Sequence, residues 1–249
     1  MSDHSSTRWH LLDTLRGFTL ISMIIFHFLY DVFIIYGRSP GWLDGPLPNV
    51  WQQCICCTFI IISGIVFHFS RSHRKRGLIL NIWGFGITLV TLLALPEETI
   101  WFGILNLIGS AILLTSFLQP ILKKIPWKVG LILAILLFLI CQEIPQGFLG
   151  CYGFRFYKLP EKWYCWFPGA WLGFPPVNFV SSDYFPLIPW LFVFWIGYYL
   201  FPFLRKSPWK KVLSWNPLPF LSLTGRKTLW IYLLHQPVLM LLCMLIFPG

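Results

Sequence analysis

Long apolar stretches separated by short polar segments run through the whole chain. Seven stretches each come close to the roughly 17–25 residues that an α-helix needs to cross the hydrocarbon of a bilayer. They cover residues 17–36, 50–70, 77–95, 99–118, 127–143, 185–204 and 227–247. They lack the period-two alternation that is typical of transmembrane β-strands. The pattern predicts an all-α, polytopic helical bundle of about seven spans.

The composition points to the same class. Of 249 residues, 57% are hydrophobic and 11% are charged, and the mean hydropathy is +0.69. A soluble domain has about 25% charged residues. The first apolar stretch is too long for a signal-peptide core and is followed by no evident cleavage site, so we expect it to remain in the mature protein. Because no internal repeat is visible, we expect one domain over residues 1–249.

The basic residues lie mainly in alternate loops. Fifteen of the 19 Lys and Arg residues precede span one or follow spans two, four and six, which the positive-inside rule places in the cytoplasm. We therefore expect a cytoplasmic N-terminus and an extracytoplasmic C-terminus. This topology and anionic headgroups account for the formal net charge of +10, so we expect membrane lipids and not nucleic acid as partners.

The largest segment outside the spans, about residues 144–184, is expected on the extracytoplasmic side and is dense in aromatic residues. Trp and Tyr favour membrane interfaces, and aromatic faces also stack on sugar rings. The segment is either an interfacial lid, which we favour, or a carbohydrate platform. Its Cys151 and Cys165 can form a disulfide in an oxidising compartment. The Cys54-x-x-Cys57 pair lacks further metal ligands, and we expect it to pack within a helix.

Span one carries two ionisable side chains, His27 and Asp31, where lipid tolerates few. Their spacing of four residues places both on one helical face. At about 1.5 Å per residue, His27 lies roughly 16 Å beyond Arg16 at the inner interface, near the middle of the bilayer. The same count puts His235 roughly 13 Å beyond Arg226, at nearly the same depth.

This placement suits acid–base chemistry. A neutral imidazole is a general base near working pH, and Asp31 can approach His27 and fix its tautomer. Asn106 is expected in the outer half of span four, and Asp183 and Tyr184 at the outer start of span six. The alternative is that His27 and Asp31 simply hydrogen-bond to other helices.

Several blocks of sequence, taken in order, resemble a known family. The blocks are Leu12-Asp13-Thr14-Leu15-Arg16-Gly17, Phe26-His27-Phe28-Leu29-Tyr30-Asp31, Phe102-Gly103-Ile104-Leu105-Asn106-Leu107-Ile108-Gly109, Asp183-Tyr184-Phe185-Pro186-Leu187-Ile188-Pro189-Trp190, Gly225-Arg226 and Tyr232-Leu233-Leu234-His235-Gln236-Pro237. Together they are similar to bacterial membrane proteins related to the catalytic region of heparan-α-glucosaminide N-acetyltransferase. The Arg, ten residues, His spacing of Arg16 and His27 also resembles the broader membrane acyltransferases that modify cell-envelope sugars.

The resemblance implies transfer of an acyl group, usually acetyl, from cytoplasmic acyl-CoA to an acceptor across the bacterial cytoplasmic membrane. It implies no metal. The residues expected to bind the donor are Arg16, Arg71, Arg74, Arg76 and His235. Those expected in catalysis are His27 as base, Asp31 as its orienting partner and Asn106 as an oxyanion donor. Those expected to bind the acceptor are Asp183, Tyr184 and Trp190.

Three departures from the family pattern limit which of its properties are expected of this chain. Acyl-enzyme schemes for the larger relatives use a histidine in the first outer loop, but residues 37–49 contain none, which favours direct transfer. Those relatives also have a large lumenal domain, so their glycosaminoglycan substrate is not extended to this chain, and the expected acceptor is an outer-facing sugar hydroxyl or an amine. Family members commonly carry His where Asn106 stands. A chain this short can also complete its site as a homodimer.

Two rival functions come from other classes. In a proton-coupled transporter or channel, His27, Asp31 and His235 would relay protons, as ionisable residues in pumps do. That function needs a continuous polar path, whereas spans three and five offer almost no ionisable residues between their ends. In a non-catalytic scaffold, the basic loops would only bind lipid headgroups.

Overall fold

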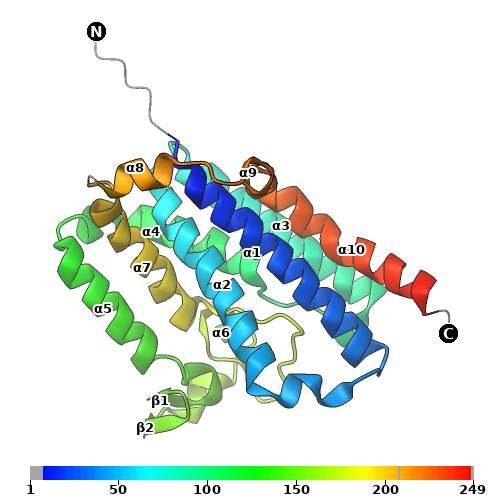
Figure 1. Ribbon diagram of the computed structural model, residues 1–249. Helices are drawn as coiled ribbons and strands as arrows, with labels where there is room; N and C mark the ends of the chain where they lie inside the picture. The colour runs from blue at the N-terminus through cyan, green and yellow to red at the C-terminus, as the bar shows by residue number, and fades with distance from the viewer. Residues whose placement is uncertain (1–7, 207, 248–249) are drawn as a thin grey trace. The chain divides into compact units, whose positions relative to one another are not determined.

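The computed structural model describes residues 8–206 and 208–247, and these are mainly helical (Figure 1). Within them, six helices are long and apolar enough to cross a membrane, so the chain is an all-α polytopic integral membrane protein, as predicted. The six are α1 (His10–Tyr30) with its π-helical continuation (Asp31–Ile35), α2 (Pro46–Phe67), α3 (His73–Ala94), α4 (Ile104–Leu122), α7 (Leu187–Leu204) and α10 (Thr228–Ile246). A shorter apolar helix, α5 (Trp127–Ile140), occupies the predicted fifth stretch.

Several helices begin or end a few residues away from the predicted limits; α1, for example, begins at His10 and not at residue 17. The prediction of a span from residue 99 is wrong by five residues, because α4 begins at Ile104. Residues before it form backbone hydrogen bonds with the segment preceding α7: the N–H of Ser182 donates to the carbonyl of Thr99, and that of Phe185 to Phe102. Helix α5 ends three residues before the predicted limit of 143, at Ile140.

Shorter elements fill the remaining segments. Before α5 lie two 3-10 turns, Pro40–Asp44 and Pro96–Glu98. Residues 144–184 hold no spanning helix, but they contain the antiparallel hairpin β1 (Phe148–Cys151) and β2 (Phe154–Lys158), the 3-10 turns Ile144–Gln146 and Glu161–Tyr164, and the short helix α6 (Gly169–Leu172). Cys151 and Cys165 are free thiols. Between α7 and α10 lie α8 (Trp209–Ser214) and α9 (Pro219–Arg226).

The chain forms two compact units. The terminal unit consists of the described residues up to Phe59 and from Leu204 onward, and the central unit consists of Ile60–Phe203. In the terminal unit α1 packs against α8, α9 and α10 (Figure 1). In the central unit α3 packs against α4.

Glycines let the helices of each unit approach backbone to backbone. A Cβ on Gly225 of α9 would lie 1.9 Å from the carbonyl oxygen of Asp13 in α1, and one on Gly17 would lie 2.0 Å from that of Leu221. In the central unit, a Cβ on Gly77 of α3 would lie 2.9 Å from the carbonyl oxygen of Gly109. Helices in lipid associate through such close packing because lipid is as apolar as a leucine side chain.

The α1–α9 contact generates a stability prediction. Gly225→Ala places its methyl group against the Asp13 backbone, which cannot move aside as a side chain would. We expect a loss of about 1–3 kcal/mol or more from overpacking, seen as a lower Tm of the purified protein. The matched control is Gly86→Ala in α3, because a Cβ there meets nothing within 4 Å. Equal Tm values for the two variants would contradict the contact.

Candidate active site

Two histidine rings of the terminal unit lie together. His27 of α1 and His235 of α10 have ring centroids 5.0 Å apart at an interplanar angle of 63°. The Nδ1 of His235 lies 2.5 Å from the carbonyl oxygen of Tyr232. Because a carbonyl only accepts, Nδ1 donates its proton, and the neutral ring carries its lone pair on Nε2. That atom is buried and has no hydrogen-bond partner among the described residues.

Asp31, four residues after His27, and Gln236, directly after His235, form a second contact between the same two segments. The Nε2 of Gln236 donates to both carboxylate oxygens of Asp31, at 2.9 and 3.1 Å, and Asp31 is only 1% exposed. Asp31 also begins the π-helical turn Asp31–Ile35, an irregularity that is frequent at functional sites. Gln236 was not selected from the sequence, although it adjoins His235 in one of the recognised blocks. The orienting of His27 by Asp31 stays a prediction.

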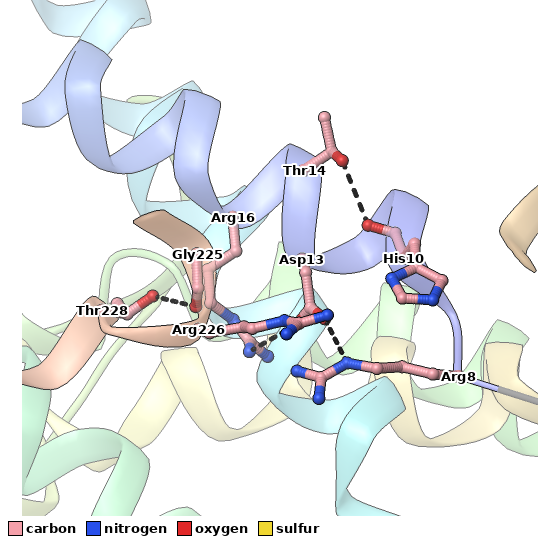
Figure 2. A network of polar contacts seen from close by, with 8 residues as sticks. All are labelled: Arg8, His10, Asp13, Thr14, Arg16, Gly225, Arg226 and Thr228. Atoms are coloured by element: carbon pink, nitrogen blue, oxygen red, sulfur yellow. Dashed lines mark hydrogen bonds and ion pairs between the residues drawn. The ribbon is translucent and has the colours of Figure 1, made fainter. Parts of the chain in front are cut away.

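Three arginines surround one carboxylate near the start of α1 (Figure 2). The Nε of Arg8 donates to Oδ2 of Asp13 at 2.8 Å, Nη1 of Arg16 lies 3.8 Å from Oδ1, and Nε of Arg226 lies 3.9 Å from Oδ2. We call these four residues the arginine cluster. Only Arg16 was selected as a donor ligand from the sequence. Since one carboxylate balances one of three guanidinium groups, the cluster retains positive charge.

We call His27 and His235 the imidazole pair. Arg16 of the arginine cluster and His27 of this pair both lie on α1. Arg16 and His27 are eleven residues apart, which is about three helical turns, so they lie on the same side of the helix and about 16 Å apart along its axis. A cation at one end of this stripe and a base at the other can serve a long ligand that carries phosphate at one end and the reacting group at the other.

Asn106 belongs to a polar network of the central unit. Its Nδ2 donates to the backbone oxygen of Asn81 at 3.4 Å, and Ser110 donates to the Asn81 side chain at 3.2 Å. The indole N–H of Trp171, from α6, donates to Ser110 at 3.1 Å. Asn106 is 1% exposed, and its Oδ1 would lie 2.5 Å from a Cβ on Gly84. Its proposed oxyanion role stays a prediction.

Of the three predicted acceptor residues, Asp183 lies at the start of α4 in the same unit. The Asp183 carboxylate accepts a hydrogen bond from the backbone N–H of Ile104; burial raises the pKa of Asp183 to about 6, and this bond opposes the shift. Tyr184 donates its hydroxyl to the carbonyl of Ala170 at 2.5 Å. Trp190 lies 5.3 Å from Phe185, centroid to centroid. Two recognised blocks, around Asn106 and around Asp183, are thus brought together.

The remaining predicted donor ligands stand at the N-terminus of α3. Arg71 precedes the helix, and Arg74 and Arg76 lie in its first turn. The unpaired N–H groups of a helix start favour anions. His73, between them, stacks on Phe67 with centroids 4.0 Å apart. The central unit therefore has a basic segment of its own that suits phosphate.

Comparison with known protein families gives a match over most of the chain. A family model described as heparan-alpha-glucosaminide N-acetyltransferase, catalytic, matches residues 8–237. No curated protein and no solved structure gives a significant match to the chain. The matched range contains the arginine cluster, the imidazole pair and the Asn106 and Asp183 blocks.

The surroundings of Asp183 generate a pH prediction. Its folded-state pKa of about 6 lies above the ordinary value of 3.8. Its contribution to stability is therefore full below the unfolded pKa and is lost as the pH rises through the folded value. Asn is a neutral isostere of the protonated carboxyl, so we expect wild type and Asp183→Asn to have similar Tm values at acidic pH, and the Tm of wild type to fall below that of the variant as the pH rises through about 6. The control is Asp44→Asn, at an exposed position. Parallel curves for wild type and Asp183→Asn would refute the assignment.

Proposed function

The chain belongs to the family of heparan-alpha-glucosaminide N-acetyltransferase catalytic regions, and on this premise we propose that it is an acyl-CoA-dependent acyltransferase. It transfers acetyl, or a short acyl group, from cytoplasmic acyl-CoA to a hydroxyl or amine of a sugar on the other side of the bacterial cytoplasmic membrane. The observation that carries the proposal is the alignment of the arginine cluster and the imidazole pair along α1.

The arginine cluster suits the phosphates of CoA. Guanidinium groups bind phosphate through paired, charge-assisted hydrogen bonds. Asp13 holds Arg8, Arg16 and Arg226 in place before a ligand arrives, so less side-chain entropy is lost on binding. From this end the flexible pantetheine arm extends about 16 Å along α1 to bring the thioester to His27.

The imidazole pair supplies the proton acceptor. As the acceptor oxygen or nitrogen attacks the thioester carbonyl carbon, it loses a proton to the pair, in which Nε2 of His235 has the open lone pair. The C–S bond then breaks, and the proton passes to the leaving thiolate to give free CoA. No acetylated residue is needed, in keeping with a first outer loop that lacks histidine.

The direct experiment measures acetyl-CoA binding and release of free thiol by the purified protein in nanodiscs, with and without amino sugars and neutral sugars. An acyltransferase binds acetyl-CoA and releases thiol faster in the presence of its acceptor. A transporter or a scaffold does neither, so absence of both activities would end the proposal.

Two histidine variants test the proton acceptor. We expect His27→Ala to lower the transfer rate by roughly 10²–10⁴-fold, the usual share of a general base, and to leave acetyl-CoA binding nearly unchanged. His235→Asn retains an N–H for the Tyr232 carbonyl but removes Nε2, so we expect a similar loss and an altered pH–rate profile. Loss of binding together with transfer would instead indicate a collapsed fold.

The arginine cluster is tested with a truncated donor. Arg226→Gln removes one guanidinium, and we expect the KM for acetyl-CoA to rise about 10-fold or more, from the loss of a charged hydrogen bond worth roughly 1.5–3 kcal/mol. S-acetylpantetheine lacks the nucleotide phosphates, so its KM should not change. The matched control is Lys210→Gln, an exposed cation of the same unit outside the cluster. Equal effects on both donors would show that Arg226 does not bind phosphate.

A further inference from the structure

Helix α5 is too short to cross a bilayer alone. Its 14 residues, Trp127–Ile140, span about 21 Å, whereas the hydrocarbon core is about 30 Å thick. The Nζ of Lys128 lies 5.8 Å from the Trp127 ring centroid, and Trp with Lys is a common anchor at a membrane boundary. With that end at one boundary, Cys141 lies about 9 Å short of the other.

The hairpin β1–β2 is bonded to the residues at this end of α5. Cys141 forms a bridge with Gly150 of β1. Glu143 accepts from the backbone N–H of Gly153 at 2.8 Å and pairs with Arg155 at 3.2 Å. Gln142 accepts from the N–H of the neighbouring turn residue at 3.2 Å. The hairpin is therefore held against the end of α5 by a backbone bridge, two hydrogen bonds and an ion pair.

The hairpin carries an exposed aromatic patch. Tyr152, Phe154, Phe156 and Tyr157 are 55–78% exposed, and β2 is exposed at every position. Phe154 and Phe156 lie on one face of the strand with ring centroids 5.6 Å apart. Exposed aromatic side chains gathered on one hairpin in this way indicate a contact with another phase or partner. The four residues are named the aromatic patch below.

We propose that the aromatic patch is embedded in the boundary between headgroups and acyl chains, in the leaflet at the C-terminal end of α5. The aromatic patch contacts lipid, because the hairpin that carries it is bonded to the end of α5, a helix too short to reach the second boundary of the bilayer. The open backbone edge of β2 cannot lie in hydrocarbon. At the headgroup level water and headgroups satisfy that edge, while the aromatic rings reach the acyl chains.

The hairpin's cations do not direct it to anionic lipid. Arg155 is paired with Glu143 and lies over the Phe148 ring, and Lys158 is paired with Glu161 at 2.8 Å. Their charge is locally balanced, so the aromatic side chains drive the contact, and zwitterionic lipid suffices. The residue after β2 is also hydrogen-bonded to the residue before β1: Leu159 donates its N–H to the carbonyl of Gly147 at 2.8 Å.

The test is site-specific photocrosslinking of the full chain in phosphatidylcholine vesicles. p-Benzoylphenylalanine replaces Phe154 or Phe156, a conservative change at exposed aromatic positions. The positive control is Leu241 of the spanning helix α10, 63% exposed, and the negative control is Glu97, exposed in the turn between α3 and α4. After irradiation, mass spectrometry identifies lipid adducts and electrophoresis identifies crosslinked chains.

We expect lipid adducts at positions 154 and 156 at yields near that of Leu241, unchanged when anionic lipid is added. Crosslinked dimers in place of lipid adducts would assign the patch to a second copy of the chain. Adduct yields as low as that of Glu97 would show that the hairpin lies in water. Either result overturns the proposal, and size-exclusion profiles matching wild type show that each variant is folded.

Discussion

No water reaches the hydrocarbon core of a bilayer, so polar side chains within the spanning helices must find partners inside the protein. Gln236 meets this need for Asp31, and Trp195 donates to Thr115 at 3.0 Å. Each bond joins helices far apart in the sequence. A mismatched pairing would leave a buried carboxylate or hydroxyl in lipid, so these few bonds select which helices are neighbours within each unit.

Some buried polar atoms near the histidines lack the hydrogen bonds that this constraint calls for. Nε2 of His235 and Oε1 of Gln236 are buried lone-pair acceptors without partners among the described residues. Each unmade bond costs about 1–3 kcal/mol. A ligand recovers that cost only if it brings hydrogen-bond donors, as the amides of a pantetheine arm or the hydroxyl or amine of an acceptor do. These unpaired acceptors support the proposed substrate site, since an incoming ligand with hydrogen-bond donors would satisfy them.

The sequence alone predicted the spans well, because run length and hydropathy are local properties. It also predicted His27 and His235 at a similar level of their helices, since helical rise converts residue counts into distance, and their ring centroids lie 5.0 Å apart. It did not predict Gln236 as the partner of Asp31, a contact between residues 205 positions apart. Nor did it predict that α5 ends at Ile140, because the residues after it form hydrogen bonds with a hairpin further along the chain. Contacts that depend on tertiary packing left no local signal.

Close helix packing at Gly225 positions one arginine of the arginine cluster. Arg226 is the last residue of α9, directly after Gly225, whose missing side chain lets α9 lie against the backbone of Asp13. With a larger residue at Gly225, α9 would stand further from α1, and Arg226 Nε would move beyond the 3.9 Å that separates it from the Asp13 carboxylate. Coulomb attraction falls with distance and more steeply once water enters. A glycine that binds nothing thus decides whether three guanidinium groups converge on one anion.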